Sequence, residues 1–539
     1  MGAPKPDRFV GIFYFLTHND SRPRADGAGP HDISKVMAQD PHALQHADSP
    51  AWGAAGGEYY WGEPLYGYYL STDPWVIRRH AQLLAAAGVD TLIFDTTNAV
   101  TYPETYTKIC EVFTEVRKAG GRTPQIVFMV NSQAGKTADQ LYHDLYQPGR
   151  FRDLWFIWKG KPLLICDSGD ASPQVKEFFM LRAAHWPFTL VNTQNAWHWE
   201  STYPQPYGYT DDPAVPEEVN VAVAQNLRAS DGRVTNMSLG DARGRSFHDG
   251  REDRSPGAVN QGYNFAEQWK RALSLAPPFV MVTGWNEWTA GRFPGKDGSS
   301  VFVDQFDEEF SRDIEPMKGG HADNYYYQLV ANVRRYKGAA PIPKGSTPKT
   351  IDISRGFDQW NDVGPDYRDS AADTIPRDFA GASGLHYSNH TGRNYLVSLK
   401  VARAAANVYF YARTQSPLTP RSDPNWMWLL LSTGRTNHPT WEGYDFIVNR
   451  TLSPDGSSWL EECQGGWTWK KIAKITLRAA GSELHLSIPR NLLHLPAGNT
   501  TKLNFKWADD LQHPGDIMDF YVSGDVAPEG RFQYRYEGE

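Results

Sequence analysis

The sequence predicts an α/β protein, a (β/α)8 TIM-like barrel followed by a C-terminal antiparallel β-sandwich. From residue 8 to about residue 338, short apolar runs alternate with amphipathic helical stretches, the pattern of a parallel sheet covered by helices. No Gly-x-Gly-x-x-Gly follows the first apolar run, which favours a barrel over a doubly wound sheet. Beyond residue 348 the apolar residues alternate with a period of two, which is typical of a sandwich.

The barrel strands are predicted where apolar runs are bounded by turn residues. In chain order they are 9–15, 91–94, 125–130, 162–166, 188–191, 219–224, 234–237 and 279–283. Helical periodicity between them predicts helices over 74–87, 106–119 and 265–275. Eight strands over this length suit a single barrel domain.

The domain boundaries follow from changes in composition. We expect the barrel over 1–338, a linker rich in Pro and Gly over 339–348, and the sandwich over 349–539. A long insertion at about 17–72 follows the first strand, and we expect it to be ordered over the mouth of the barrel. The sandwich strands are predicted at 395–402, 407–412, 427–432, 444–449, 483–489 and 502–507.

Charge and cysteine content exclude several classes of protein. The 54 Lys and Arg against 62 Asp and Glu give a net charge of −8, which argues against a nucleic-acid partner or a membrane surface. No apolar run is long enough to span a membrane. Three widely spaced cysteines form neither a disulfide framework nor a zinc site, and we expect no metal and no cofactor. The start of the chain and five Asn-x-Ser/Thr sites lead us to expect a secreted or periplasmic protein, of open oligomeric state.

Polar side chains stand at the carboxyl ends of the predicted strands. They are Asp95, Asn131, Asp167, Asn192, Gln194, Asn286 and Glu287. In a barrel these ends meet at one mouth, where active sites collect. Carboxylates and carboxamides gathered there suit the recognition of a molecule with many hydroxyl groups.

The run Trp285-Asn286-Glu287-Trp288 is the sharpest motif. A carboxylate between two indoles is partly removed from water, which raises its pKa toward that of a general acid or base. We expect Glu287 to be catalytic and Trp285 and Trp288 to form platforms for sugar rings. A structural glutamate under an aromatic lid is the alternative.

Cleavage of a glycoside needs a second carboxylate across the bond. The candidates are Asp167, which we favour narrowly, and then Glu200, with Asp95 more suited to a hydrogen-bond network. The aromatic stretch after the fifth strand predicts a subsite wall formed by Trp197, His198, Trp199 and Tyr203. Arg292, five residues beyond Glu287, could bind a sulfated or uronic sugar through its guanidinium group.

The segment 283–293, TGWNEWTAGRF, resembles the NEW-x-x-G strand-end signature of glycoside hydrolase family 99, the endo-α-mannosidases, and is similar to family 71. The resemblance implies a sugar-active barrel and an α-linked substrate cleaved internally. Family 99 carries two catalytic carboxylates three residues apart. Glu287 matches the first, but Ala290 stands at the second position. The layout of the predicted sandwich is similar to carbohydrate-binding modules of family 9.

These observations predict a glycoside hydrolase that acts on a polysaccharide or large glycan, with an anionic substrate as one possibility. Ala290 suggests the main alternative, a non-catalytic protein that binds glycans or serves polysaccharide assembly. A polysaccharide lyase is the weaker alternative.

Overall fold

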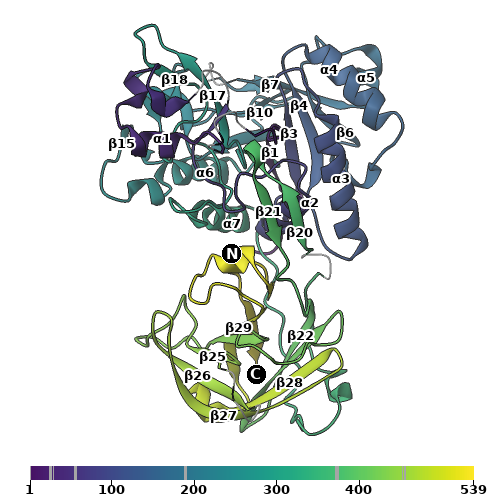
Figure 1. Ribbon diagram of the computed structural model, residues 1–539. Helices are drawn as coiled ribbons and strands as arrows, with labels where there is room; N and C mark the ends of the chain where they lie inside the picture. Colours follow the sequence, from purple (N-terminus) through teal and green to yellow (C-terminus); the bar gives the residue numbers. More distant parts are fainter. Residues whose placement is uncertain are drawn as a thin grey trace. The chain divides into compact units, whose positions relative to one another are not determined.

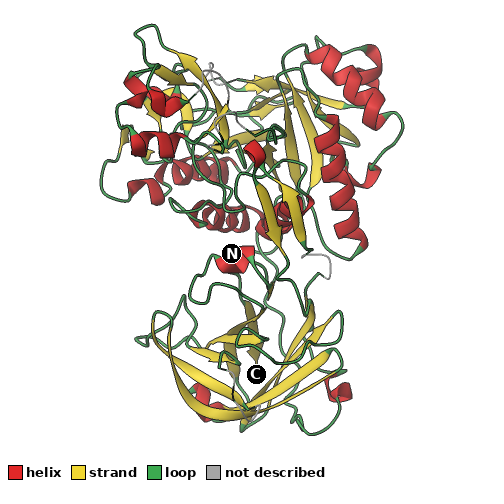
Figure 2. Cartoon of the chain, in the orientation of Figure 1, coloured by secondary structure: helices red, strands yellow, loops and turns green. Residues whose placement is uncertain are grey.

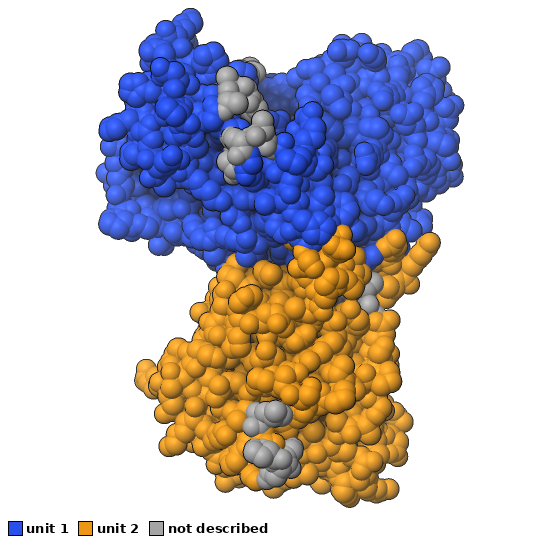
Figure 3. Space-filling view, in the orientation of Figure 1, with its two compact units in different colours: residues 1–114, 123–339, 379–387 blue, residues 115–122, 340–378, 388–539 orange. Residues whose placement is uncertain are grey.

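The computed structural model describes residues 2–23, 27, 29–53, 58–186, 191–370, 375–451, 453 and 457–539. The chain forms two compact units, coloured separately in Figure 3. Unit 1 comprises residues 1–114, 123–339 and 379–387, and unit 2 comprises residues 115–122, 340–378 and 388–539.

Unit 1 is a TIM-like barrel. Its eight parallel strands within the described residues are β1 (Phe9–Tyr14), β3 (Thr91–Thr96), β4 (Gln125–Val130), β6 (Lys161–Ile165), β7 (Met180–His185), β9 (Ala196–His198), β11 (Glu218–Ala222) and β16 (Phe279–Thr283) (Figure 1). They pair in the order β11-β16-β1-β3-β4-β6-β7-β9. The short strands β8 (Thr193–Gln194), just before β9, and β10 (Gly208–Tyr209) bridge the remaining gap, because β10 pairs with both β8 and β11.

Helices follow most of the barrel strands (Figure 2), although among the described residues none lies between β7 and β9 or between β9 and β11. They are α2 (Pro74–Ala87), α3 (Pro103–Lys118), α4 (Ala134–Leu141), α5 (Pro173–Phe178), α6 (Tyr263–Leu275) and α7 (Asn324–Lys337). The predicted helix over 74–87 is confirmed to the residue. Asp73 accepts hydrogen bonds from the first backbone N–H groups of α2, and Gly88 ends it with a φ of 83° that glycine adopts without strain.

Six of the eight predicted strands are confirmed, and the strand at 234–237 is wrong. Val234 forms only an isolated bridge with Leu227, and Met237 begins a short 3-10 turn. Residues 188–190 of the predicted strand at 188–191 lie outside the described residues. The barrel instead uses β7 and β9, which carry no continuous apolar run.

The interior of the barrel is filled by side chains. Ile93, Met129 and Ile165 point inward together with Trp197 and Phe279. Glycine is required at position 11 of β1, because a Cβ there would lie 2.6 Å from Cζ of Phe279. The closed, packed interior leaves the ends of the strands as the place for a site.

The insertion after β1 is ordered where it is described. It contains α1 (Ile33–Gln39) and β2 (Glu58–Tyr60), and β2 pairs with β17 (Thr289–Pro294), which pairs with β18 (Ser300–Phe302). The other short strands of unit 1 are β5 (Ile157–Trp158), β12 (Gln225–Arg228), β13 (Ala242–Arg243), β14 (Phe247–His248) and β15 (Arg251–Glu252). The insertion is thus tied to the loop that carries Glu287.

Unit 2 is an antiparallel β-sandwich. Its strands are β19 (Tyr367–Arg368), β22 (Leu396–Arg403), β23 (Asn407–Thr414), β24 (Trp428–Ser432), β25 (Phe446–Val448), β26 (Ser458–Gly465), β27 (Thr468–Ala480), β28 (Glu483–Pro489), β29 (Thr501–Asp509), β30 (Asp525–Ala527) and β31 (Tyr534–Gly538). A short helix, α8 (Asp519–Val522), precedes β30. The hairpin β20 (Arg377–Ala380) and β21 (His386–Asn389) carries at its tip the residues 379–387 that belong to unit 1.

The six predicted sandwich strands are present, but the prediction omits the short strands β19, β30 and β31 and the longer β26 and β27. β27 is the longest strand described, and charged residues make up much of its exposed face. Its core-facing residues are few, so its apolar pattern is weak. The Trp426-x-Trp428 pair of the WMWLLL run is buried.

Candidate active site

The loop after β16 holds Glu287 in a fixed position. The Asn286 side chain accepts from the backbone N–H of Phe15 at 2.9 Å and donates to its carbonyl at 3.2 Å, so it joins the loop to the end of β1. The Glu287 backbone N–H donates to Asp313. Asn286, expected to bind substrate, is fully buried and acts as a brace.

Trp285 and Trp288 were expected as sugar platforms, and this is wrong, because both indoles are 0% exposed. Trp288 stacks on Trp61 of the insertion at 4.7 Å and donates through Nε1 to Glu315 at 2.6 Å. Trp285 packs edge-on against His80 of α2 at 5.5 Å. The two rings anchor the loop on either side of Glu287 and cannot touch a ligand.

Glu287 opens into a pocket of about 280 Å³ at the carboxyl ends of the barrel strands. The lining residues are Phe13, Phe15, Asp95, Thr97, Trp186, Trp199, Asn226, Val234, Glu287, Asp304 and Arg312. They come from β1 and β3, from the loops after β7, β9 and β11, and from the loop after β16. The pocket therefore lies where barrel enzymes place their active sites.

Arg312 is the centre of the charged groups in this pocket. Its Nη2 lies 2.8 Å from Oε2 of Glu287 and 3.8 Å from Oδ1 of Asp304. Its Nη1 lies 3.4 Å from Oε2 of Glu200. Gln305 also donates to Oε2 of Glu287, at 2.5 Å, and Asn226 donates its backbone N–H to Glu200 at 3.0 Å. The buried guanidinium group of Arg312 thus contacts three acidic side chains.

Burial makes Glu287, Glu200 and Asp95 harder to ionise. Burial raises the pKa of Glu287 well above its ordinary value, against the opposing effect of Arg312. Burial likewise raises the pKa of Glu200 to about 7 and that of Asp95 above its usual range. Burial opposes the charge of Arg312, but the carboxylates around it outweigh burial and raise its pKa. Burial therefore disfavours the ionised form of Glu287, and Arg312 opposes that effect.

The three predicted catalytic carboxylates are not equally placed. The side chain of Glu287 is 12% exposed and lines the pocket. Glu200 reaches the same guanidinium group but is fully buried, so it stands behind the pocket wall. Asp167 is exposed, follows β6 and accepts from the Gly169 backbone N–H at 2.7 Å. It caps a turn and does not line the pocket, because the loop after β6 contributes no residue to it.

Among the predicted binding residues, Asp95 and Trp199 line the pocket and the others do not. Trp197 fills the barrel interior at 4.2 Å from Phe279, because residues 197 and 199 point the same way along the strand. His198 points away from it and contacts Glu218 at 3.3 Å, with no exposed surface.

Four further predicted residues lie outside the lining of the pocket. Asn131 accepts from Nε1 of the pocket residue Trp186 at 3.1 Å. Asn192 accepts from the backbone of Tyr207, and Gln194 donates to the carbonyl of Thr210, so both close the barrel through β8 and β10. Tyr203 is half-buried and is not among the lining residues.

Arg292 does not point into this pocket. Its Nη1 donates to the Ala47 carbonyl at 2.9 Å and to Ser300 at 3.1 Å. The guanidinium group lies over the rings of Trp52 and Tyr59. These contacts hold the insertion on β17 and β18, and they account for the arginine without an anionic sugar.

Sequence reasoning missed Arg312, Asp304, Trp186 and Asn226. Asp304 and Arg312 lie in a long irregular loop after β18, where no periodicity marks them. Trp186 directly follows β7, a strand that was itself not predicted. The one available signal was the rule already used for Asp95, that a polar or aromatic residue at a strand end faces the mouth.

The pocket holds buried polar atoms that no described residue satisfies. Nε1 of Trp199 and Oδ1 of Asn226 have no hydrogen-bond partner within the described residues. A donor and an acceptor beside aromatic walls suit a ligand that carries both hydroxyl groups and apolar C–H faces. No group of three or more His, Cys, Asp and Glu that could hold a metal occurs among the described residues. In that same part of the chain no helix is long and apolar enough to cross a membrane.

Comparisons with known proteins add a distant likeness of fold. No family model matches the sequence, and no curated protein matches it significantly. The GH99 endo-alpha-mannosidase from Bacteroides thetaiotaomicron matches 62% of this chain and 99% of its own, with 13% identity and a TM-score of 0.36. Its complex with bis-tris-propane gives a TM-score of 0.35, at 13% identity, over 62% and 98% of the two chains.

A further match concerns a carbohydrate binding module of family 9 from Caldicellulosiruptor kristjanssonii in complex with glucose. It covers 37% of this chain and 94% of its own, with 11% identity and a TM-score of 0.20. Likenesses this distant carry no argument about the activity of this chain.

Proposed function

We propose that the protein is a glycoside hydrolase with its active site at Glu287. The observation that carries this proposal is a half-enclosed pocket at the carboxyl end of a barrel, in which a buried acid, a second carboxylate and aromatic rings converge. The raised pKa of Glu287 suits a general acid at neutral pH. Its buried anchors, Asn286 and Trp288, hold it in one orientation.

Asp304 is the proposed partner of Glu287. It lines the pocket and its side chain is 48% exposed, so substrate and water can reach it. One oxygen of each carboxylate contacts the same Nη2 atom of Arg312, at 2.8 Å for Glu287 and 3.8 Å for Asp304. The shared contact brings the two carboxylates close together, which is compatible with the separation of about 5–5.5 Å found in retaining enzymes, and we propose that mechanism.

The reaction then follows two steps. Glu287 gives its proton to the glycosidic oxygen as the C–O bond breaks, and the Asp304 carboxylate attacks the anomeric carbon to form a glycosyl ester. Glu287, now ionised, takes a proton from a water molecule whose oxygen attacks the anomeric carbon, so that the ester bond to Asp304 breaks and the sugar leaves. The charge of Arg312 stabilises both carboxylates in their ionised states, and the buried Glu200 holds the guanidinium group in place.

The substrate of the Glu287 pocket is proposed to be neutral. The cation that lines the pocket is Arg312, and three acidic side chains already contact it, which weakens its attraction for a sulfate or uronate. Trp186, which lines the pocket with its ring 5.1 Å from that of Trp199, takes the role of sugar platform that was expected for Trp285 and Trp288. The motif resemblance supports α-linked polysaccharides as the first candidates to test.

The test is hydrolysis of a panel of neutral and anionic polysaccharides by the full chain and by Glu287→Gln and Asp304→Gly. We expect released oligosaccharides with the native protein and a loss of at least about 10²-fold in each variant. Azide should restore turnover in Asp304→Gly by replacing the nucleophile, giving a glycosyl azide. If azide restores turnover only in Glu287→Gln, the roles of the two residues are exchanged. If the native protein hydrolyses none of the glycans, the proposal is overturned.

A glycan-binding protein without catalysis is the second candidate, and Ala290 favours it. Ala290 is buried in β17 opposite Tyr59, so no carboxylate occupies the position that family 99 uses. In that case Glu287→Gln should change the affinity for glycan, while no products form with either protein.

A further inference from the structure

The Glu287 loop, residues 284–288, is attached on both sides of Glu287 to one buried residue, Glu315. Glu315 lies in the loop between β18 and α7 and has no exposed surface. Its backbone N–H donates to the Trp285 carbonyl at 3.0 Å, and its Oε2 accepts from Nε1 of Trp288 at 2.6 Å. A single residue therefore holds the chain before and after the proposed acid.

Further buried side chains complete the hydrogen bonding of Glu315. Tyr69 donates its hydroxyl to Oε2 at 2.7 Å, and Nε2 of His80 on α2 lies 2.9 Å from Oε1. Nδ1 of His80 lies 2.8 Å from the hydroxyl of Tyr14 on β1. With its proton on Nε2, His80 donates to Glu315 and accepts from Tyr14. Three donors from distant segments thus compensate the carboxylate for its loss of water.

The partners of this carboxylate also contact the loop. The His80 ring packs edge-on against Trp285 at 5.5 Å, and the Tyr69 hydroxyl accepts from Nδ2 of Asn286 at 3.4 Å. The three residues that flank the glutamate of the motif therefore all contact one buried network, and the glutamate between them faces the pocket.

This network cannot touch a ligand. Tyr14 and Tyr69 are each 2% exposed, His80 is 1% exposed, and none of them lines the Glu287 pocket. Burial and the charge of Glu315 raise the pKa of both tyrosines well above its ordinary value, so their hydroxyls stay protonated. Any effect of the network on the reaction therefore passes through the loop that it holds.

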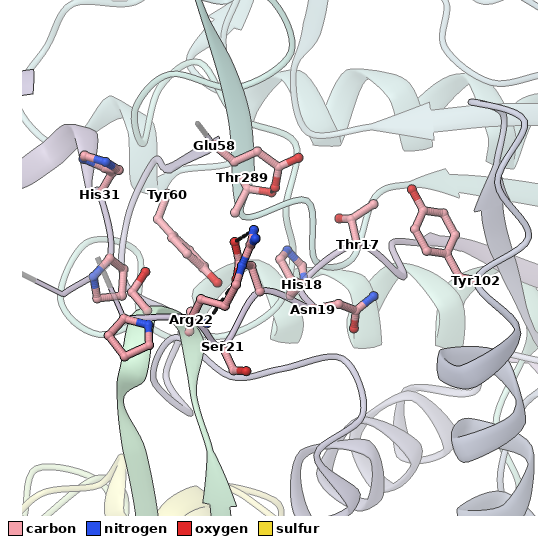
Figure 4. A pocket seen from close by; sticks show the side chains of 15 residues that line it. Thr17, His18, Asn19, Ser21, Arg22, His31, Glu58, Tyr60, Tyr102 and Thr289 are labelled. Carbon is pink, nitrogen blue, oxygen red and sulfur yellow. Dashed lines mark hydrogen bonds and ion pairs between the residues drawn. The ribbon is translucent and has the colours of Figure 1, made fainter. Parts of the chain in front are cut away.

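Beyond Trp288 the chain is held by a different element, β2. The Trp61 N–H donates to the Trp288 carbonyl at 3.1 Å. Oγ1 of Thr289 donates to Glu58 of β2 at 3.1 Å, and both residues line a separate groove of unit 1 (Figure 4). Because these contacts do not involve Glu315, β17 should stay in place when Glu315 is replaced, and it serves as an internal reference.

We propose that Glu315 is the positioning residue of Glu287 and that it acts by holding the Glu287 loop through its hydrogen bonds. The kinetic part of this inference rests on the proposed hydrolase function. Without the carboxylate, the buried donors of Trp288 and Tyr69 lose their acceptor, so the loop opens more often. A shift of a catalytic group by about 1 Å can cost about 10²-fold in rate.

The experiment compares variants of the full chain. Glu315→Leu removes the acceptor, whereas Glu315→Gln keeps an amide oxygen that both Trp288 and Tyr69 can reach. Glu217→Gln is the control, because it changes another buried carboxylate of the barrel, one that is paired with Arg182. Amide hydrogen exchange read by mass spectrometry measures the opening of residues 284–288 relative to β17.

We expect Glu315→Leu to speed the exchange of the loop at least about tenfold relative to β17. Its kcat should fall by about 10²-fold while KM changes by less than about threefold, because the loss concerns the transition state. Glu315→Gln should stay within about threefold of the native protein in both measurements. Glu217→Gln should leave the relative exchange of the loop unchanged.

The pH profile separates positioning from a general loss of stability. A displaced Glu287 loses burial, so its raised pKa falls and the alkaline limb of kcat/KM should move to lower pH in Glu315→Leu. Glu217→Gln should keep the limb in place. The charged groups that act on Glu287 are the same in all these variants, namely Arg312, Asp304 and Asp313.

If Glu315→Leu does not fold, Tyr69→Phe provides the test. It deletes only the hydroxyl that joins Glu315 to Asn286, and we expect loop exchange about threefold faster. Its control is Tyr336→Phe, which deletes a buried hydroxyl that donates to the Pro277 carbonyl.

Three outcomes decide the matter. Loop exchange as slow as in the native protein, in Glu315→Leu or in Tyr69→Phe where that variant is used, overturns the positioning role. Equal impairment of Glu315→Gln and Glu315→Leu assigns the effect to the charge of Glu315 and overturns it as well. A native protein that hydrolyses no glycan overturns the proposed hydrolase, and the exchange rates alone then decide whether Glu315 holds the loop.

Discussion

Two carboxylates near opposite ends of the barrel strands show how charge balance separates a structural group from a reactive one. Glu217, just before β11, receives hydrogen bonds from Arg182 at 2.6 and 2.7 Å and from the indoles of Trp158 and Trp197 at 3.1 Å. Lys159 adds an ion pair at 2.8 Å. Glu287, after β16, shares one arginine with two other carboxylates.

The pKa values of the two residues move in opposite directions. Burial would raise the pKa of Glu217, but Arg182 and Lys159 outweigh burial and lower it strongly. At Glu287 the single cation cannot outweigh burial, and the pKa rises. Burial is therefore common to both sites, and the number of cations for each carboxylate decides which one can exchange a proton at neutral pH.

The largest effect is expected from neutralising each carboxylate in turn. Glu287→Gln should lower the hydrolytic rate by at least about 10²-fold. Its free energy of unfolding should be unchanged or higher. Glu217→Gln leaves Arg182 buried without its partner and should lower the free energy of unfolding by about 3–5 kcal/mol. Urea unfolding and rates per folded molecule measure both. If Glu287→Gln lost stability and Glu217→Gln did not, Glu287 would be the structural carboxylate and the comparison would be wrong.

Removing the shared cation should change the pH profile. Without the charge of Arg312, the pKa of Glu287 rises further, so Arg312→Gln should move the alkaline limb of kcat/KM to higher pH by about one unit or more. Arg182→Gln should lower the free energy of unfolding and leave the alkaline limb of kcat/KM at the same pH. An unmoved alkaline limb in Arg312→Gln would show that Glu287 is not the acid whose titration limits the rate.

The stability of the fold should respond to pH through Glu200. Burial raises its pKa from 4.5 to about 7, so its contribution is fully present below pH 4.5 and is lost as the pH rises toward 7. That loss amounts to about 3 kcal/mol. Glu200→Gln should not show this pH-dependent loss. Its free energy of unfolding, measured with urea, should therefore rise relative to that of the native protein between about pH 5 and about pH 8. Parallel stability curves for the two proteins would contradict the assignment.

The smallest effect is expected at Asp167. It is exposed and caps a local turn, so Asp167→Asn should alter stability by less than about 0.5 kcal/mol and leave kcat/KM nearly unchanged. If Asp167→Asn lowered kcat/KM as much as Asp304→Gly does, Asp167 would be a catalytic residue.

Much of the fold follows from local patterns. The apolar runs at β1, β3, β4, β6, β11 and β16 are buried in a parallel sheet, and such strands read as continuous apolar segments. β7 and β9 escaped prediction because MLRAAH and AWH are short and half polar. The position of Glu287 at the mouth followed from the strand-end rule, whereas its partners lie in a loop that carries no pattern. Secretion or a periplasmic location stays a prediction.

The sequence by itself determined the two architectures and placed Glu287 at a strand end, because periodicity and strand-end chemistry act over a few residues. The tertiary structure alone decided that Trp285 and Trp288 are buried anchors and that Arg312, 25 residues along the chain, is the cation beside Glu287. Which face an indole buries, and which charges meet across a pocket, depend on segments far apart in the chain. Contacts between side chains so far apart in the sequence leave no local pattern from which they could be predicted.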